Sequence, residues 1–356
     1  MTAPTTLWYT RCPVPTAFSI AIQKGWLDDE FAGDGIAIRS LASVQERGVR
    51  QSHFDATQPN FFRHGGNGPP IIARSRGADI RVVALSWNRG YKVILALPES
   101  GIRTAADLKG KRISVPRRIN DSVDFWRAAV LRGFDHVLRG AGLSFDDVIP
   151  VEVATGRTFV EDTRAGAERN ASLWDARFML GHQREEAFAL VRGQVDAIYS
   201  HGAIAALVEG FLGATTVAEF GGETAPGGLA NNDRPYVLTV SGKLIDERQD
   251  LVARWLTRVL AAADWAQRHE AESKQIIAAE TGLAVELVDR AYSPLIHREL
   301  ALGLGSDQID ALKSQYQHLL TQNFLTQSVD IDTFIDPRPL AAARELLAAR
   351  PQLIAA

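Results

Sequence analysis

Short apolar segments of strand length alternate with helical segments through the first two hundred residues. Residues 7–10 have the pattern of a short strand, and Phe18, Ala21 and Ile22 follow at helical spacing. Further strands are expected over residues 36–41, near residues 52–56, and over residues 80–86, 91–97, 112–116 and 195–200. This alternation predicts an α/β fold with mostly parallel sheets flanked by helices.

Helical patterns dominate the last third of the chain. Paired apolar residues recur at Leu251/Val252 and Trp255/Leu256, which is the stripe of an amphipathic helix. The 356 residues, 46% of them hydrophobic, are enough to form two domains with substantial cores.

The charge balance argues against two classes of partner. Lysine and arginine total 39 against 42 acidic residues, and the basic residues are scattered along the chain. A net charge of −3 gives no electrostatic attraction to nucleic acid or to an anionic membrane surface. No run of about 18–20 apolar residues predicts a membrane span, and residues 1–9 lack the features of a secretory signal. We therefore expect a cytoplasmic protein, and the sequence does not predict its oligomeric state.

Sequence signatures of metals and organic cofactors are missing. The eight histidines show no His-x-x-x-His pairing, and a single cysteine excludes both an intramolecular disulfide and a cysteine-based zinc site. Neither a P-loop nor a clear G-x-G-x-x-G fingerprint follows a predicted strand. The sequence therefore predicts neither a metal nor a cofactor.

The single cysteine, Cys12, stands between a predicted strand and a predicted helix. A thiol at a helix N-terminus faces unpaired backbone N–H groups and the positive end of the helix dipole, which favour the reactive thiolate. A lone cysteine is also often a small buried hydrophobic residue. Position alone leaves both interpretations open.

Three segments further along resemble one family of binding proteins. These segments are Gly25-Trp26-Leu27, residues 99–113 (ESGIRTAADLKGKRI) and residues 193–198 (GQVDAI). They are similar to segments of the nitrate/sulfonate/taurine solute-binding proteins of ABC transporters. The resemblance implies a periplasmic-binding-protein-like type II fold with a ligand cleft between two α/β lobes. We expect residues 1–93 with 202–356 to form lobe I, and residues 94–201 to form lobe II.

The N-terminal third carries a more specific resemblance, to the aryl sulfinate desulfinases that use this fold. It rests on residues 9–15 (YTRCPVP), on His53-Phe54, and on Arg63 followed by Gly65-Gly66. The resemblance implies that Cys12, His53 and Arg63 are the functional cysteine, histidine and arginine of the site. It also implies that the backbone N–H of Gly66 helps to hold a sulfinate.

The chemistry of these residue types fits a small sulfur oxyanion. The planar guanidinium of Arg63 can bind two sulfinate oxygens at once, and the Gly65-Gly66 turn can supply a backbone donor. Cleavage of the aryl carbon–sulfur bond needs either a proton delivered to the ring carbon or nucleophilic attack at sulfur. A thiol can do either, so both roles of Cys12 remain open, with His53 as its partner. Taken singly, His53 is also typical of a strand end and Arg63 of a solvated helix.

Five further residues are candidates for binding the rest of the ligand, because they differ from the desulfinase pattern or follow a predicted strand. They are Arg11, His64, Arg117, Arg118 and His201. These differences leave the substrate open beyond a small, anionic and aromatic organosulfur compound.

Two functions from different classes follow from these observations. The first is a cytoplasmic desulfinase-like hydrolase that releases sulfite from an aryl sulfinate. The alternative is a solute-binding protein that holds a sulfonate, a sulfinate or an aromatic anion without reacting with it.

Overall fold

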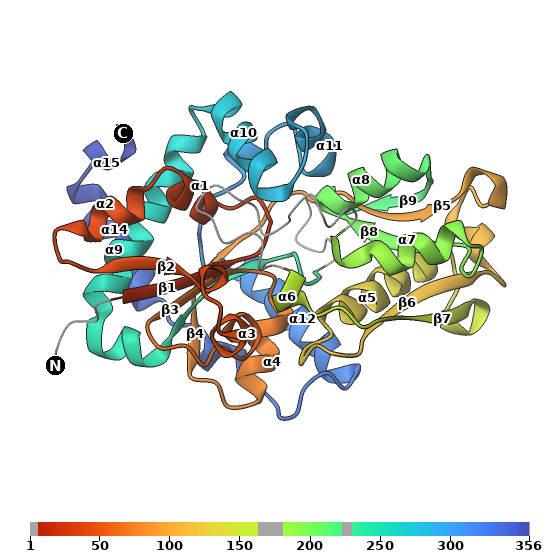
Figure 1. Cartoon of the computed structure of the whole chain (residues 1–356), viewed down its shortest axis with the longest axis horizontal. Coiled ribbons are helices and arrows are strands. Elements are labelled where there is room, and N and C mark those ends of the chain that lie inside the picture. Colours follow the sequence, from red (N-terminus) through yellow and green to blue (C-terminus); the bar gives the residue numbers. More distant parts are fainter. Residues whose placement is uncertain (1–5, 163–180, 223–229, 356) are drawn as a thin grey trace.

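Three β-sheets, one in the first lobe and two in the second, form the centres of two lobes in the computed structural model, which describes residues 6–162, 181–222 and 230–355 (Figure 1). The chain leaves the first sheet after β4 (Ile80–Ser86), enters the second at β5 (Lys92–Ala96), and returns at β10 (Tyr236–Ser241). The α/β fold predicted from the alternating pattern is therefore confirmed, with antiparallel as well as parallel strand pairs where mostly parallel sheets were expected.

The first sheet has five strands in the order β2-β1-β3-β10-β4. Strand β1 (Thr6–Arg11) lies parallel to β2 (Ala37–Ser40) and to β3 (Phe61–Gly65), whereas β10 runs antiparallel to β3 and β4. Because β1 and β3 are parallel neighbours, the loops that follow them leave the sheet at the same edge.

The second lobe contains a three-stranded antiparallel sheet, β8-β5-β9, and a parallel pair, β6-β7. A bridge between Ile113 and Ala197 connects the two groups of strands. The strands are β6 (Arg112–Arg118), β7 (Ile149–Thr155), β8 (Ile198–His201) and β9 (Thr215–Phe220).

Helices cover both lobes, and local signals set several of their ends. The N-cap residue Thr16 accepts a hydrogen bond from the backbone N–H of Ser19, and Pro69 and Pro70 occupy the first turn of α4. The helices are α1 (Ala17–Gln23), α2 (Trp26–Ala32), α3 (Arg47–Asp55), α4 (Gly68–Ser75), α5 (Phe125–Gly140), α6 (Phe159–Asp162), α7 (Arg184–Val191), α8 (Gly202–Leu212), α9 (Gly242–Ala266, kinked at Arg248), α10 (Glu270–Thr281), α11 (Val288–Ala291), α12 (Ser306–Thr321), α13 (Ile331–Phe334), α14 (Arg338–Ala349) and α15 (Gln352–Ala355). None of the described helices is long and apolar enough to span a membrane.

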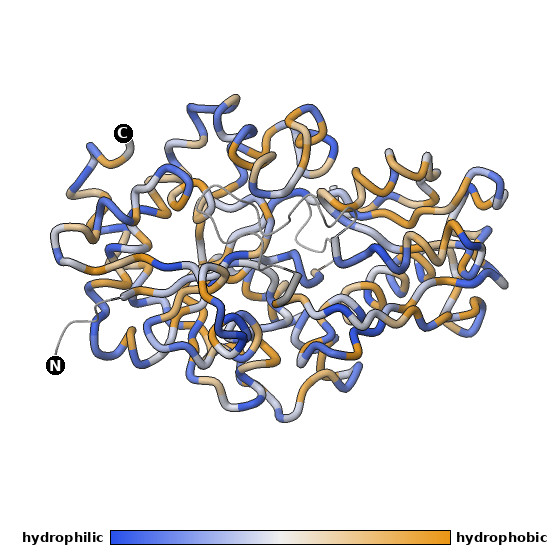
Figure 2. The backbone as a smooth tube through the Cα atoms, viewed as in Figure 1, coloured by the Kyte–Doolittle hydropathy of each residue, from blue (hydrophilic) through white to orange (hydrophobic). Residues whose placement is uncertain are grey.

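The core of the first lobe forms where α9 packs on the sheet. The Trp255 ring stacks on Phe62 of β3 at a centroid distance of 4.0 Å, and Phe18 and Phe31 contact the same indole. Figure 2 shows hydrophobic and hydrophilic residues interspersed along the strands and helices of both lobes. This packing holds the β1–β3 edge in place.

Two expectations differ from the structure. Residues 52–56 were expected to form a strand, but Ser52 to Asp55 form the last turn of α3 and Ala56 ends it, so the third strand is β3. The chain was expected to return from lobe II to lobe I at residue 202, but it returns to the first sheet only at β10. The segment from α8 to β9 still packs on the second sheet, because β9 pairs with β5.

Candidate active site

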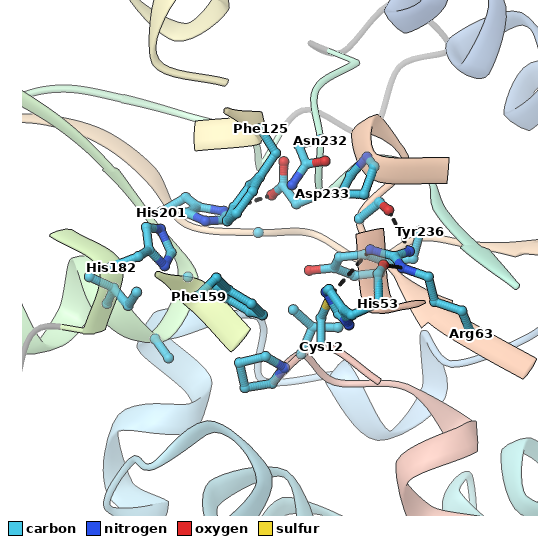
Figure 3. Close-up of a pocket in the computed structure, with 18 of the residues that line it drawn as sticks. Cys12, His53, Arg63, Phe125, Phe159, His182, His201, Asn232, Asp233 and Tyr236 are labelled. Carbon is cyan, nitrogen blue, oxygen red and sulfur yellow. Dashed lines mark hydrogen bonds and ion pairs between the residues drawn. The ribbon is translucent and has the colours of Figure 1, made fainter. Parts of the chain in front are cut away.

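A pocket lies between the lobes, at the edge where β1 and β3 end (Figure 3). The first lobe contributes the residues that directly follow these strands, and the second lobe contributes aromatic rings from α5 and α6. The lining residues are Cys12, Pro13, Val14, His53, Phe54, Arg63, Gly66, Pro69, Gly90, Phe125, Phe159, His182, His201, Gly202, Ala203, Ile204, Asn232, Asp233, Tyr236 and Tyr292. The pocket therefore combines polar groups with an aromatic wall.

Cys12 is held directly after β1 by the backbone of the neighbouring strand. Its N–H donates to the carbonyl of His64 at 3.0 Å, which extends the pairing between β1 and β3 by one residue. Helix α1 begins at Ala17, so its first turn does not include the thiol, contrary to the expected position at a helix N-terminus. The positive group beside Sγ is instead the guanidinium of Arg63, whose Nη2 lies 3.7 Å away.

His53 approaches the thiol from the last turn of α3. Its Nε2 lies 3.9 Å from Cys12 Sγ, and its Nδ1 forms a 3.0 Å hydrogen bond with the hydroxyl of Thr10. Burial, reinforced by the positive charge of Arg63, lowers the pKa of His53 well below its usual value. The imidazole is therefore neutral at pH 7, and the Thr10 hydroxyl fixes the orientation of its ring.

Arg63 is buried, with 1% of its surface exposed, and it is fixed by the backbone on both sides. Its Nε donates to the carbonyl of His53 at 3.0 Å, and its Nη1 donates to the carbonyl of Gly66 at 2.8 Å. Burial lowers the pKa of the guanidinium, and Cys12 opposes this shift. With Nη2 directed to the thiol, three of the five N–H donors of an arginine are used. The remaining donors belong to the two Nη atoms.

The two glycines after Arg63 allow close packing around the thiol. A Cβ added at Gly65, where φ is +158°, would lie 2.3 Å from Cys12 Sγ. A Cβ at Gly66 would lie 2.5 Å from the side-chain amide of Asn232. Gly66 lines the pocket, whereas Gly65 lies directly against Cys12.

Arg11 and His64 do not line the pocket. Thr10 pairs with Arg63 and Arg11 pairs with His64 across β1 and β3, so alternate side chains point to opposite faces of the sheet. Arg11 forms a buried ion pair with Glu280 at 2.6 Å. His64 bonds to the Ser86 hydroxyl at 3.1 Å, and burial lowers its pKa to about 3. Both residues belong to the interior behind the site.

The two arginines of the second lobe also lie outside the pocket lining. Arg117 is exposed on β6 and pairs with Glu152, and Arg118 is buried in an ion pair with Asp121. Each arginine is already paired with a carboxylate, and neither reaches the pocket. The expectation that Arg117 and Arg118 bind the ligand is therefore not supported.

His201, in contrast, lies on the second-lobe wall of the pocket, beside residues that the sequence did not single out. Its Nδ1 lies 3.3 Å from a carboxylate oxygen of Asp233. Asp233, Asn232 and Tyr236 come from the segment before and at the start of β10, where no motif marked them. Among the described residues, no group of three or more His, Cys, Asp or Glu side chains could hold a metal ion.

Comparisons with known proteins identify similar sequences. Residues 15–168 match the family described as NMT1/THI5 like. The 2′-hydroxybiphenyl-2-sulfinate desulfinase of Rhodococcus erythropolis is 28% identical over 351 residues, which cover 93% of this chain and 92% of that protein.

Solved structures extend the comparison to the fold. A crystal structure of a cysteine-to-serine variant of DszB in complex with biphenyl-2-sulfinic acid matches with a TM-score of 0.77 and 26% identity. It covers 96% of this chain and 99% of that chain. The alkanesulfonate-binding protein SsuA from Xanthomonas axonopodis shares the fold at a TM-score of 0.63 and 20% identity, over 94% of this chain and 99% of that chain. The chain is thus a homologue of 2′-hydroxybiphenyl-2-sulfinate desulfinase, with the periplasmic-binding-protein-like fold of the sulfonate-binding proteins.

Proposed function

We propose that the protein is a desulfinase that cleaves the carbon–sulfur bond of an aryl sulfinate and releases sulfite. One observation carries this proposal. At one end of an aromatic pocket, the Cys12 sulfur lies within 3.9 Å of His53 Nε2 and 3.7 Å of Arg63 Nη2. A reactive thiol, a neutral base and an anion-binding guanidinium are therefore aligned at one point.

The remaining N–H groups of Arg63 would bind the sulfinate oxygens. Because its other N–H groups bind backbone carbonyls of His53 and Gly66, the guanidinium is already oriented before the ligand arrives. The aryl group would then lie between the rings of Phe54, Phe125 and Phe159.

Two balanced routes lead from this complex to products. In the first, the Cys12 thiol protonates the ring carbon as the carbon–sulfur bond breaks, and water adds to the released sulfur dioxide to form hydrogen sulfite. His53 accepts the proton that this water releases and returns it to the sulfur of Cys12, which restores the thiol. In the second, His53 takes the proton of the thiol, the thiolate attacks the sulfinate sulfur, and the ring carbon leaves with the proton that His53 returns. Water then hydrolyses the resulting Cys12 S-sulfinate, in which the thiol sulfur carries the SO2 group, to hydrogen sulfite and free thiol. Neither route needs an oxidant or a reductant.

The experiment measures sulfite released from biphenyl-2-sulfinate and 2′-hydroxybiphenyl-2-sulfinate. We expect Cys12→Ser to lower kcat by about 1000-fold or more while it still binds the sulfinate, because both routes use the thiol. Arg63→Lys should raise KM, because a lysine cannot hold two oxygens in a fixed plane. Arg139→Lys is the matched control, because Arg139 is an exposed residue of α5 paired with Asp135.

Full activity in Cys12→Ser, or no sulfite from either compound, contradicts the proposal. Intact mass spectra of the protein quenched during turnover separate the two routes. An adduct of Cys12 that carries the mass of sulfur dioxide supports nucleophilic attack, and unmodified protein supports protonation.

The second candidate is a binding protein, because SsuA shares the fold. Calorimetry with an aryl sulfonate tests it. Tight binding that Cys12→Ala leaves unchanged, together with no turnover of the matching sulfinate, favours this function. We further propose a cytoplasmic location, which fractionation of cells that produce the protein would test.

A further inference from the structure

The second-lobe wall of the pocket contains a buried cluster of charged groups that the proposed chemistry does not use. Asp233 accepts from Lys92 Nζ at 2.9 Å and lies 3.3 Å from Nδ1 of His201. The side chains of Lys92 and Asp233 are 1% and 7% exposed. Burial alone would raise the pKa of the Asp233 carboxyl, but Lys92 and His201 hold it well below its usual value. Asp233 is therefore a carboxylate at neutral pH.

This carboxylate determines what His201 can offer to a ligand. A carboxylate only accepts hydrogen bonds, so the nitrogen that faces it, Nδ1, carries a proton. Lys92 pairs with the same carboxylate, 2.9 Å away. With the proton on Nδ1, Nε2 is the imidazole nitrogen that can accept a hydrogen bond, and within residues 6–162, 181–222 and 230–355 no hydrogen bond to it is found.

The ring of His201 is also fixed in direction. It stacks on Trp126 at a centroid distance of 5.1 Å and an interplanar angle of 29°, and Trp126 is buried. Figure 3 shows His201 and His182 on one side of the pocket, Cys12, His53 and Arg63 on the other, and Phe159 between them. An acceptor is thus held at the end of the pocket opposite the thiol, across an aromatic wall.

We propose that His201, oriented by Asp233 and Lys92, determines specificity by accepting a hydrogen bond from a donor group on the part of the aryl ligand remote from the sulfinate. The ligand class is an aryl sulfinate with a hydroxyl or amino substituent at that end. This inference rests on the proposed function for the position of the sulfinate beside Arg63. It adds a recognition role that the residues around Cys12 do not have.

The test uses Cys12→Ser protein, so that binding is measured without turnover. Calorimetry compares biphenyl-2-sulfinates that carry a hydroxyl, an amino or a methyl group at the same position of the second ring, for each of its three positions. At one position or more, we expect the hydroxyl or amino compound to bind about 10-fold or more tightly than the methyl compound. This ratio corresponds to about 1.4 kcal/mol, the size of one hydrogen bond in a buried site.

Two variants remove the acceptor. His201→Phe keeps the ring on Trp126 and loses both nitrogens, whereas His201→Asn keeps a donor for Asp233 but is too short to place its own acceptor oxygen at the position of Nε2. Both should bring the ratio to about one, and thermal unfolding verifies that each variant is folded. His269→Phe is the matched control, since His269 also stacks on a tryptophan, Trp265, at a centroid distance of 4.2 Å, and does not line the pocket.

Three outcomes overturn the inference. They are equal binding of donor and methyl compounds at every position, a ratio that both His201 variants retain, and a ratio that His269→Phe removes. The proposed function fails separately, if the wild-type protein releases no sulfite from any of these compounds. The binding ratio is informative in either case.

Discussion

At the scale of single residues, the space beside the thiol is defined by Gly65. The position calculated for its Cβ is 2.3 Å from Cys12 Sγ, closer than a Cβ comes to any heavy atom it is not bonded to. Gly65→Ala must therefore displace the sulfur from His53 and Arg63. A shift of about 1 Å in a reacting group costs on the order of 100-fold in rate, so we expect kcat to fall by that order. Sulfite release measures it.

Gly77→Ala is the control for the backbone effect of this change. Gly77 also has a positive φ, +92°, but a Cβ there would meet nothing within 4 Å. Both variants should lose stability, by thermal unfolding, because alanine is strained at positive φ. Only Gly65→Ala should lose rate, and an equal loss in both would show that the contact with Cys12 is unimportant.

Arg63 and His64 show how much the sequence could predict at this scale. The resemblance identified Cys12, His53 and Arg63 as a set, and all three line the pocket. It did not show which neighbours share their face of the sheet. The register of β1 with β3 shows which neighbours share that face, and it places Arg11 and His64 on the face of the sheet opposite Arg63.

At the scale of elements, helix α3 shows why part of the fold was not predicted. Arg50, Ser52 and His53 are buried although they are polar, because they face the pocket and neighbouring loops. Figure 2 shows α3 as a largely hydrophilic segment. A helix that buries polar side chains lacks the apolar stripe on which sequence patterns depend.

Helix α7 contributes a buried carboxyl that makes stability depend on pH. Glu186 accepts from Trp126 Nε1 at 2.6 Å and from the Ser114 hydroxyl at 3.0 Å, and burial raises its pKa to about 8. The folded protein therefore holds a proton that the unfolded chain releases near pH 4.5. The resulting stabilisation is complete below pH 4.5 and is lost as the pH rises towards 8.

Glu186→Gln tests this linkage. Glutamine keeps an acceptor for Trp126 and cannot ionise, so the variant should lose less stability than the wild type between pH 5 and pH 8. Urea unfolding at several pH values measures how the free energy of unfolding changes with pH in the wild type and in the variant. Parallel curves would show that Glu186 does not contribute to the pH dependence.

At the scale of the whole molecule, contacts of α3 connect the two lobes. His53 stacks on Phe159 at 5.1 Å, Arg50 donates to the carbonyl of Val160, and Gln51 donates to the Ser122 hydroxyl at 2.8 Å. A ligand that touches both walls of the pocket adds to these contacts and stabilises this arrangement of the two lobes.

Ligand binding should therefore stabilise the whole chain. At 100 times its Kd, biphenyl-2-sulfinate should stabilise the Cys12→Ser protein by about 2.7 kcal/mol, seen as a rise in Tm. The double variant with Arg63→Met, which lacks the guanidinium, should show a smaller rise at the same concentration. An equal rise in both proteins would place the sulfinate away from Arg63.

The reactive end and the aromatic wall of the pocket come from different stretches of the chain. Cys12, His53 and Arg63 lie within the first 66 residues and on one lobe, whereas Phe125, Phe159 and His201 come from the other lobe. Under the proposed function, bond cleavage and choice of compound are thus encoded in different parts of the gene. We therefore expect changes around Phe125, Phe159 and His201 to redirect such a protein to new aromatic sulfur compounds and to leave its reactive centre as inherited.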